Sequence, residues 1–185
     1  TSHISVVDRY GNAVAMTTTI EDQFGARVMV RGFLLNNELT DFSFLPQEGG
    51  QPVANRIEPG KRPRSSIAPT IVYDRHGKPL IVTGSPGGSA IINYVAKSIV
   101  AMLDWGMTPQ QAADLPNFGS RNGPTEIERG TALEALKPAL EARGHTVSVL
   151  DFTSGLHILQ RVDGKRGRQW RGGADPRREG IVLGD

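Results

Sequence analysis

The chain has 185 residues, of which 38% are hydrophobic and 22% charged, and its formal net charge is +2 at pH 7. This is the composition and length of one globular domain with a sizeable core. Cysteine is absent, which excludes disulfides and thiol chemistry. No signal peptide opens the chain, and no apolar run approaches the roughly 18 residues that span a bilayer.

Strands dominate the first half of the chain. Residue patterns rich in β-branched side chains predict strands over residues 4–7, 13–20, 28–35, 67–73 and 80–83. Turns of one type, Asp-X-X-Gly, join the first two strands and the last two into hairpins. Residues 43–64, which precede the second hairpin, are expected to form a long irregular connection. Loops of this length are uncommon unless they are functional.

Helices are predicted next, and strands then return. Ile92, Val95, Ile99 and Met102 form one apolar stripe on a helix expected over residues 90–103. Thr108 and Pro109 have the pattern of a helix start, which predicts a short helix ending near Leu115. Further elements are expected as a helix over 132–143, irregular at Pro138, and strands over 147–152 and 157–162.

The order of elements indicates the fold class. Strands followed by helices and more strands favour an α+β fold, with an antiparallel sheet layered with helices, over a doubly wound parallel sheet. No linker divides the chain, so residues 1–185 are expected to form a single domain.

Thr1 is the first candidate for chemistry. The chain begins Thr1-Ser2-His3 and has no initiator methionine. One interpretation is trimming of the chain, and the other is a peptide bond cut to expose Thr1. A free α-amine has a pKa of roughly 7.7–8.0, so it can take the proton of a threonine hydroxyl near neutral pH. Threonine and its own N-terminal amine form a recognised activated nucleophile.

A glycine-rich loop, Gly84-Ser85-Pro86-Gly87-Gly88-Ser89, lies between a predicted strand and a predicted helix. A phosphate-binding loop would need a Lys-Ser/Thr pair at its end, and this loop has none. An oxyanion hole needs two oriented N–H groups, which Gly87 and Gly88 are suited to supply. A simple tight turn remains the alternative.

Two polar segments are candidate ligand sites. Glu38 and Asp41, in the run 36–41, suit a ligand ammonium, although such residues also cap loops. Ser65 and Ser66 follow the basic residues at 61–64 and suit a carboxylate, with a solvated basic loop as the alternative.

Metal and nucleic-acid binding are weakly supported. The histidines, His3, His76, His145 and His157, fall in unrelated positions without metal-ligand spacing. A basic run at 165–171 includes Trp170, a pattern that can bind nucleic acid. Because glycines separate the basic residues of this run, we interpret it as a solvated hairpin. A non-enzymatic nucleic-acid-binding module is the least favoured reading.

Several motifs in order along nearly the whole chain resemble the small subunit of γ-glutamyltransferases. They are Thr1-Ser2-His3 with 5–8 and 11–15, Leu34–Phe42, Arg62–Thr70, Thr83–Ser89 and Gly173–Arg177. This resemblance implies an N-terminal nucleophile hydrolase: a four-layer αββα sandwich of two antiparallel sheets. It also implies a precursor that cuts itself before Thr1 and leaves a separate large subunit bound non-covalently.

The resemblance implies roles for individual residues. Thr1 would be the nucleophile that attacks the γ-glutamyl amide of glutathione-like substrates, and Thr19 would tune the Thr1 amine. Gly87 and Gly88 would form the oxyanion hole. The α-ammonium of the substrate would be held by Glu21, Glu38 and Asp41. Its α-carboxylate would be held by Ser65 and Ser66. No cofactor or metal is implied, and the implied compartment is the periplasm or the extracellular space.

Two departures from the family pattern concern the substrate. Glu21 stands where many members have asparagine, and the segment between Phe24 and Leu34 is short, so the loop that covers the site in other members is expected to be absent. Cephalosporin (glutaryl) acylases resemble the same pattern and accept a side chain without the α-amino group. The acidic residues favour γ-glutamyl compounds over that alternative.

Overall fold

The computed structural model describes residues 1–164 and 167–184. The chain divides into two compact units. Unit 1 contains Thr1 and Thr18–Ser66, and unit 2 contains Ser2–Thr17 and Ile67–Asp185. Each unit is described by itself below.

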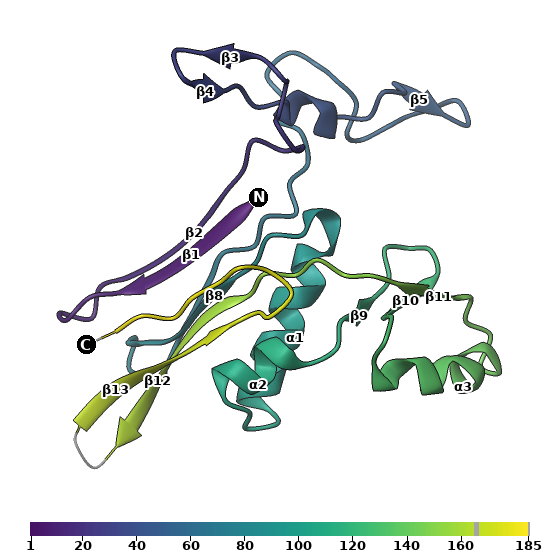
Figure 1. The fold of residues 1–185 in the computed structure, drawn as a ribbon. Helices are drawn as coiled ribbons and strands as arrows, with labels where there is room; N and C mark the ends of the chain where they lie inside the picture. Colours follow the sequence, from purple (N-terminus) through teal and green to yellow (C-terminus); the bar gives the residue numbers. More distant parts are fainter. Residues whose placement is uncertain (165–166, 185) are drawn as a thin grey trace. The chain divides into compact units, whose positions relative to one another are not determined.

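Antiparallel pairing organises unit 2 (Figure 1). Its four-stranded sheet has the order β13-β12-β8-β7, formed by Gly167–Ala174, His157–Gly164, Pro79–Gly84 and Thr70–Tyr73. Strands β1 (Ser2–Val7) and β2 (Ala13–Thr18) form a separate two-stranded sheet. Ser5 links the two sheets, because its Oγ donates a hydrogen bond of 2.9 Å to the carbonyl of His157 in β12. Both predicted hairpins are thus confirmed.

Helices α1 (Ile91–Leu103) and α2 (Pro109–Asp114) pack against the four-stranded sheet and close the main core. The core contains Ile81, Ile91, Tyr94, Val95, Ala101, Met102, Ala112, Ala113, Leu156 and Ile158. The predicted stripe is wrong at Ile92, which is 55% exposed. The buried face is centred one residue earlier, on Ile91, so Ile92 lies at its margin. Thr108 caps α2 with a capping box, as the Thr-Pro pattern predicts.

A small mixed sheet follows α2. It has the order β11-β10-β9, formed by Val147–Leu150, Thr125–Glu128 and Phe118–Gly119. Strands β10 and β11 are parallel, whereas β9 and β10 are antiparallel. Parallel neighbours need a crossover. Here the crossover holds the predicted helix, as a 3₁₀ turn η3 (Ala132–Leu136) continuing into α3 (Lys137–Glu141).

Unit 1 has short elements and long connections. The single strand predicted over 28–35 is wrong: Met29–Val30 (β3) and Phe33–Leu34 (β4) form a small hairpin. Its turn is Arg31-Gly32, with φ values of 49° and 90° that break an extended strand. The irregular connection over 43–64 contains one further small hairpin, β5 (Gln47–Glu48) with β6 (Gln51–Pro52). Glu38–Asp41 forms a 3₁₀ turn, η1.

These elements confirm an α+β fold in which antiparallel pairing predominates. Within residues 1–164 and 167–184, no helix has the length and apolar character to cross a membrane.

Candidate active site

Thr1 and Thr19 meet through their hydroxyl groups in unit 1. Thr1 Oγ1 donates a hydrogen bond of 2.9 Å to Thr19 Oγ1, and the backbone N–H of Glu21 donates one of 2.8 Å to the same oxygen. Thr19 therefore fixes the rotamer of the Thr1 hydroxyl. The family resemblance implies that Thr19 tunes the Thr1 amine; the hydrogen bond in the structure joins the two hydroxyls, and the effect on the amine stays a prediction.

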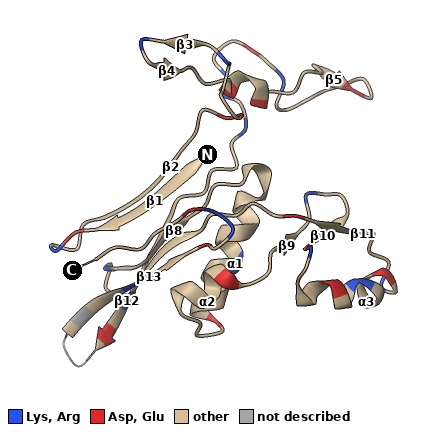
Figure 2. Cartoon of the chain, in the orientation of Figure 1, with Lys and Arg blue, Asp and Glu red and all other residues tan. Residues whose placement is uncertain are grey.

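Acidic side chains gather beside this pair. Glu38 and Asp41 lie in η1, and the acidic positions of this turn are coloured in Figure 2. Burial raises the pKa of Glu38, and the carboxylates of Asp41 and Glu21 raise it further, while the α-amine of Thr1 acts in the opposite direction. Among the described residues, Glu38 Oε1 is buried and has no hydrogen-bond partner. The cluster thus has surplus negative charge and one buried carboxylate oxygen without a hydrogen-bond partner.

Two asparagines hold this cluster in place. Asn37 Nδ2 donates a hydrogen bond of 2.8 Å to Glu21 Oε2, and Asn37 Oδ1 accepts one of 3.0 Å from the backbone N–H of Asp22. Asn55 Nδ2 donates to the carbonyl of Asp41 at 2.7 Å, and its Oδ1 accepts from the N–H of Arg64 at 2.9 Å. The positioning by Asn55 was not predicted, because no local pattern relates residue 55 to residues 41 and 64.

Ser65 and Ser66 follow directly on the segment that Asn55 anchors. Ser65 is exposed and Ser66 is half-buried. They belong to the same unit as Thr1, Thr19 and the acidic cluster. The nucleophile candidate and the predicted head-group residues thus lie within one compact part of the chain.

The glycine-rich loop belongs to unit 2 and follows β8. Gly87 has φ 135° and Gly88 has φ 59°, values that favour glycine. At Gly87 a side chain is also excluded by Tyr94, whose Cε2 would lie 2.4 Å from an added Cβ. Within the described residues, neither N–H of this Gly-Gly pair donates a hydrogen bond to a protein acceptor. Both donors are therefore available to an external oxygen.

His3 and His157 are neighbours, which corrects the view that the histidines are unrelated. Their rings are stacked with centroids 6.4 Å apart, and His157 Nδ1 lies 2.6 Å from the carbonyl of His3. His3 Nδ1 lies 2.7 Å from Thr17 Oγ1. Burial, assisted by the charge of His157, lowers the pKa of His3 to about 4. No group of three potential ligands in the described residues is arranged to hold a metal ion.

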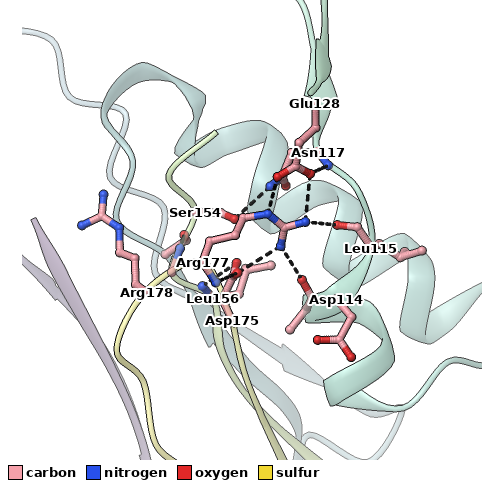
Figure 3. Close-up of polar contacts among 12 residues, drawn as sticks. Asp114, Leu115, Asn117, Glu128, Ser154, Leu156, Asp175, Arg177 and Arg178 are labelled. Carbon is pink, nitrogen blue, oxygen red and sulfur yellow. Dashed lines mark hydrogen bonds and ion pairs between the residues drawn. The ribbon is translucent and has the colours of Figure 1, made fainter. Parts of the chain in front are cut away.

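The C-terminal motif at 173–177 forms a buried polar network that was not predicted (Figure 3). Arg177 pairs with Glu128 of β10 through Nε and Nη2 and with Asp175 through Nη1 at 3.0 Å. Its Nη2 also donates a hydrogen bond of 3.1 Å to the carbonyl of Leu115. Asn117 joins Glu128 to the neighbouring loop, because its N–H donates to Glu128 Oε2 at 2.7 Å and its Nδ2 donates to Ser154 Oγ at 2.9 Å.

Residues 167–171 of the basic run lie in strand β13 of the β12–β13 hairpin. The strands confirm the expected hairpin, and Lys165 and Arg166 lie outside the described residues.

Known proteins share both the sequence and the structure of this chain. The sequence pattern of the gamma-glutamyltranspeptidase family matches residues 1–184. A glutathione hydrolase proenzyme from Escherichia coli K12 is 40% identical over 189 residues, covering 96% of this chain and 31% of that protein. The chain thus spans about a third of the length of the curated relatives it matches.

Two solved structures extend the comparison. A mutant gamma-glutamyltranspeptidase of Helicobacter pylori has a TM-score of 0.87 at 35% identity, covering 96% of this chain and all of the other. A cephalosporin acylase from Bacillus halodurans has a TM-score of 0.83 at 27% identity, covering 98% of this chain and 33% of that one. These likenesses confirm the expected N-terminal nucleophile hydrolase fold. The chain belongs to the gamma-glutamyltranspeptidase family.

Proposed function

We propose that residues 1–185 form the single catalytic domain of a γ-glutamyl hydrolase/transferase and act as its small subunit. One observation carries this proposal. The Thr1 hydroxyl donates a hydrogen bond to Thr19 and lies beside an acidic cluster in which a buried Glu38 oxygen has no hydrogen-bond partner. A nucleophile and an ammonium-binding pocket in one unit suit a substrate whose scissile amide is three carbons from its amino group.

The chemistry proceeds by acyl transfer. Thr1 Oγ1 attacks the γ-carbonyl carbon while its proton passes to the α-amine, and the carbonyl oxygen becomes an oxyanion. The N–H groups of Gly87 and Gly88 stabilise that oxyanion. Collapse breaks the C–N bond, the leaving amine takes the proton, and the γ-glutamyl ester remains on Thr1. Water or an acceptor amine then attacks the ester and restores the free hydroxyl.

Substrate selection depends on the amino-acid head group. Glu38, Asp41 and Glu21 bind the α-ammonium, and Ser65 and Ser66 bind the α-carboxylate. The surplus negative charge around Glu38 supports the first contact. The segment between Phe24 and Leu34 forms only the short β3–β4 hairpin, which supports an uncovered site that admits large γ-glutamyl compounds.

The partner in this proposal is a large subunit from the same precursor, and the compartment is the periplasm or the extracellular space. Support comes from the outward face of β1 and β2, where Ile4, Val6, Val14 and Met16 are 44–51% exposed. A row of apolar side chains on a two-stranded sheet needs a cover. The part of the relatives that this chain does not span is long enough to provide it.

The processing step is tested with the full-length precursor. We expect Thr1→Ala to remain a single uncut chain without activity, because the hydroxyl that performs the cleavage is gone. Thr18→Ala, at a neighbouring exposed threonine, is the control and should yield two chains. The measurement is the mass of the denatured protein. A Thr1→Ala protein that is cut and fully active would overturn the proposal.

Substrate class is tested by comparing γ-glutamyl-p-nitroanilide with a glutaryl-cephalosporin. We expect a higher kcat/KM for the γ-glutamyl compound because the acidic cluster attracts its ammonium. Preference for the glutaryl compound would instead support an acylase, the function named for the structurally similar protein of Bacillus halodurans.

A further inference from the structure

Arg121 connects the glycine-rich loop to the small mixed sheet. Its Nη1 donates a hydrogen bond of 2.5 Å to Ser89 Oγ, and its Nη2 pairs with Glu126 Oε1 at 2.5 Å. Glu126 lies in β10 and is only 9% exposed, so it is a fixed anchor. The guanidinium therefore bridges a rigid strand and the residue directly after Gly88. All these residues belong to unit 2.

The segment that carries Arg121 is itself seated against the start of α1. Gly119 lies so close to Asn93 that an added Cβ would be 2.0 Å from Asn93 Nδ2. This contact fixes β9 against the first turn of the helix. Gly119 is two residues before Arg121. The contact with Asn93 therefore fixes the backbone close to the residue whose guanidinium reaches Ser89.

The other end of the loop is held by different contacts. Ser85 Oγ accepts a hydrogen bond of 3.0 Å from the N–H of Gly155, and the ring of Tyr94 packs beneath Gly87. Gly88 and Ser89 are exposed. Within the described residues, Arg121 is the one side chain that hydrogen-bonds to Ser89. The 3₁₀ turn Gly88–Ala90 closes this end through a hydrogen bond of 3.3 Å from the Ala90 N–H to the Gly87 carbonyl, and the guanidinium adds the side-chain contact that holds the turn in place.

We propose that Arg121 is a positioning residue for the oxyanion hole: by holding Ser89 it fixes the peptide planes of Gly87 and Gly88, whose N–H groups then point at one oxygen. The inference rests on the proposed function, since it assigns a support to the donors used there. Oxyanion stabilisation depends on donors that are oriented before the reaction begins. Without Arg121 the exposed end of the loop is released. The N–H groups of Gly87 and Gly88 are then still present, but they no longer point at one oxygen.

The alternative is an ordinary ion pair between Arg121 and Glu126 that contributes little to anything. The two readings differ at Ser89. If Arg121 acts through the loop, removing the Ser89 hydroxyl should have the same effect as removing the guanidinium. If Arg121 serves Glu126 alone, Ser89 should be irrelevant.

The test uses processed enzyme made from the full-length precursor, with γ-glutamyl-p-nitroanilide as substrate. For Arg121→Ala we expect kcat to fall about 10-fold, the value of one charge-assisted hydrogen bond, with KM changed less than about 2-fold. Arg121→Lys should restore part of the loss. Ser89→Ala should resemble Arg121→Ala, and the double variant should be no worse than either. Arg129→Ala removes an exposed arginine that pairs with Asp151, and it should match the wild type.

A second measurement keeps this inference separable from the proposed function. Amide hydrogen exchange over residues 86–90 should be faster in Arg121→Ala than in Arg129→Ala, whichever substrate the enzyme takes. Unchanged exchange, or a kcat equal to that of the wild type, would overturn the role of Arg121. A wild-type enzyme that cleaves no γ-glutamyl compound while exchange still responds to Arg121→Ala would overturn the function and leave the loop support standing.

Discussion

At the scale of single residues, the half-buried Glu38 has one buried carboxylate oxygen and too few partners. Its Oε1 has no hydrogen-bond partner within the described residues, and Asp41 and Glu21 add negative charge nearby. A carboxylate in that position costs free energy in the empty site, because burial disfavours its charged form. A bound ammonium offsets the cost. The residue is thus poorly satisfied alone and well satisfied with the proposed substrate.

Replacing Glu38 by glutamine should therefore affect binding more than chemistry. We expect KM for γ-glutamyl-p-nitroanilide to rise about 10-fold or more, as a charge-assisted hydrogen bond is lost, with kcat less affected. Glu48→Gln changes an exposed glutamate of β5 and is the matched control. Equal KM values in the two variants would contradict the assignment.

The raised pKa of Glu38 also predicts a pH dependence. As the pH falls, Glu38 loses its charge before an ordinary glutamate does, so kcat/KM of the wild type should begin to fall at a higher pH than an ordinary glutamate would cause.

The limits of sequence reasoning are visible at individual residues. Glu38 and Asp41 were found because two carboxylates in one short run after an apolar strand form a local pattern. Asn55 and Arg121 escaped notice, since their contacts join residues 5 to 32 positions apart through loops without periodicity. The pairing of His3 with His157 was missed for the same reason: it depends on β1 lying against β12.

At the scale of elements, β1 begins directly after Thr1 and has a buried histidine, His3, as its second residue. His3 is enclosed by Thr17 of β2, Ser5 of β1, His157 of β12 and Gly84 of β8, where an added Cβ would lie 2.2 Å from the His3 ring. Such enclosure leaves no room for hydration of an imidazolium. Burial lowers the pKa of His3 from 6.5 to about 4 for this reason.

The stability of the protein should therefore depend on pH through His3. The unfolded chain protonates this histidine below about pH 6.5, whereas the folded chain keeps it neutral down to about pH 4. Unfolded protein binds more protons across that window, so stability should fall as the pH drops from 6.5 to 4. Thermal melting of the processed protein should show this fall, and His3→Gln should reduce it. His76→Gln, at an exposed turn, should leave the pH dependence as it is; an equal effect of both variants would argue against His3 as the source.

Elements with local signals were predicted well. Both hairpins depend on an aspartate that caps its own turn: Asp8 Oδ1 accepts from the N–H groups of Tyr10 and Asn12, and Asp74 Oδ1 does the same for His76 and Lys78. Strand β10 was missed because its two buried glutamates, Glu126 and Glu128, read as polar. Their burial is compensated by arginines that only the fold brings near.

At the scale of the whole molecule, Arg177 ties the end of the chain to its middle. Its guanidinium pairs with Glu128 of β10 and with Asp175 (Figure 3). It also donates hydrogen bonds to the carbonyls of Ala113 and Leu115 at the end of α2. The C-terminal segment has little regular structure of its own after β13. The ionic network thus substitutes for strand pairing and apolar packing in that segment.

Breaking this network should lower stability far more than breaking an exposed pair. Removing one partner of a buried ion pair typically costs about 3–5 kcal/mol, because the other charge stays buried without compensation. Glu128→Gln keeps the side-chain volume and should fall at the lower end of that range, since Asp175 still faces Arg177. In the double variant with Arg177→Gln the two losses should not add, because Glu128 no longer leaves a buried charge and only Asp175 loses its partner. Lys137 and Glu141 form an exposed pair in α3 with an N–O distance of 3.8 Å, and the same changes there should cost a small fraction as much. Urea unfolding of the processed protein at fixed concentration measures both cycles, and additive losses at Glu128 and Arg177 would show that the two side chains stabilise the chain independently.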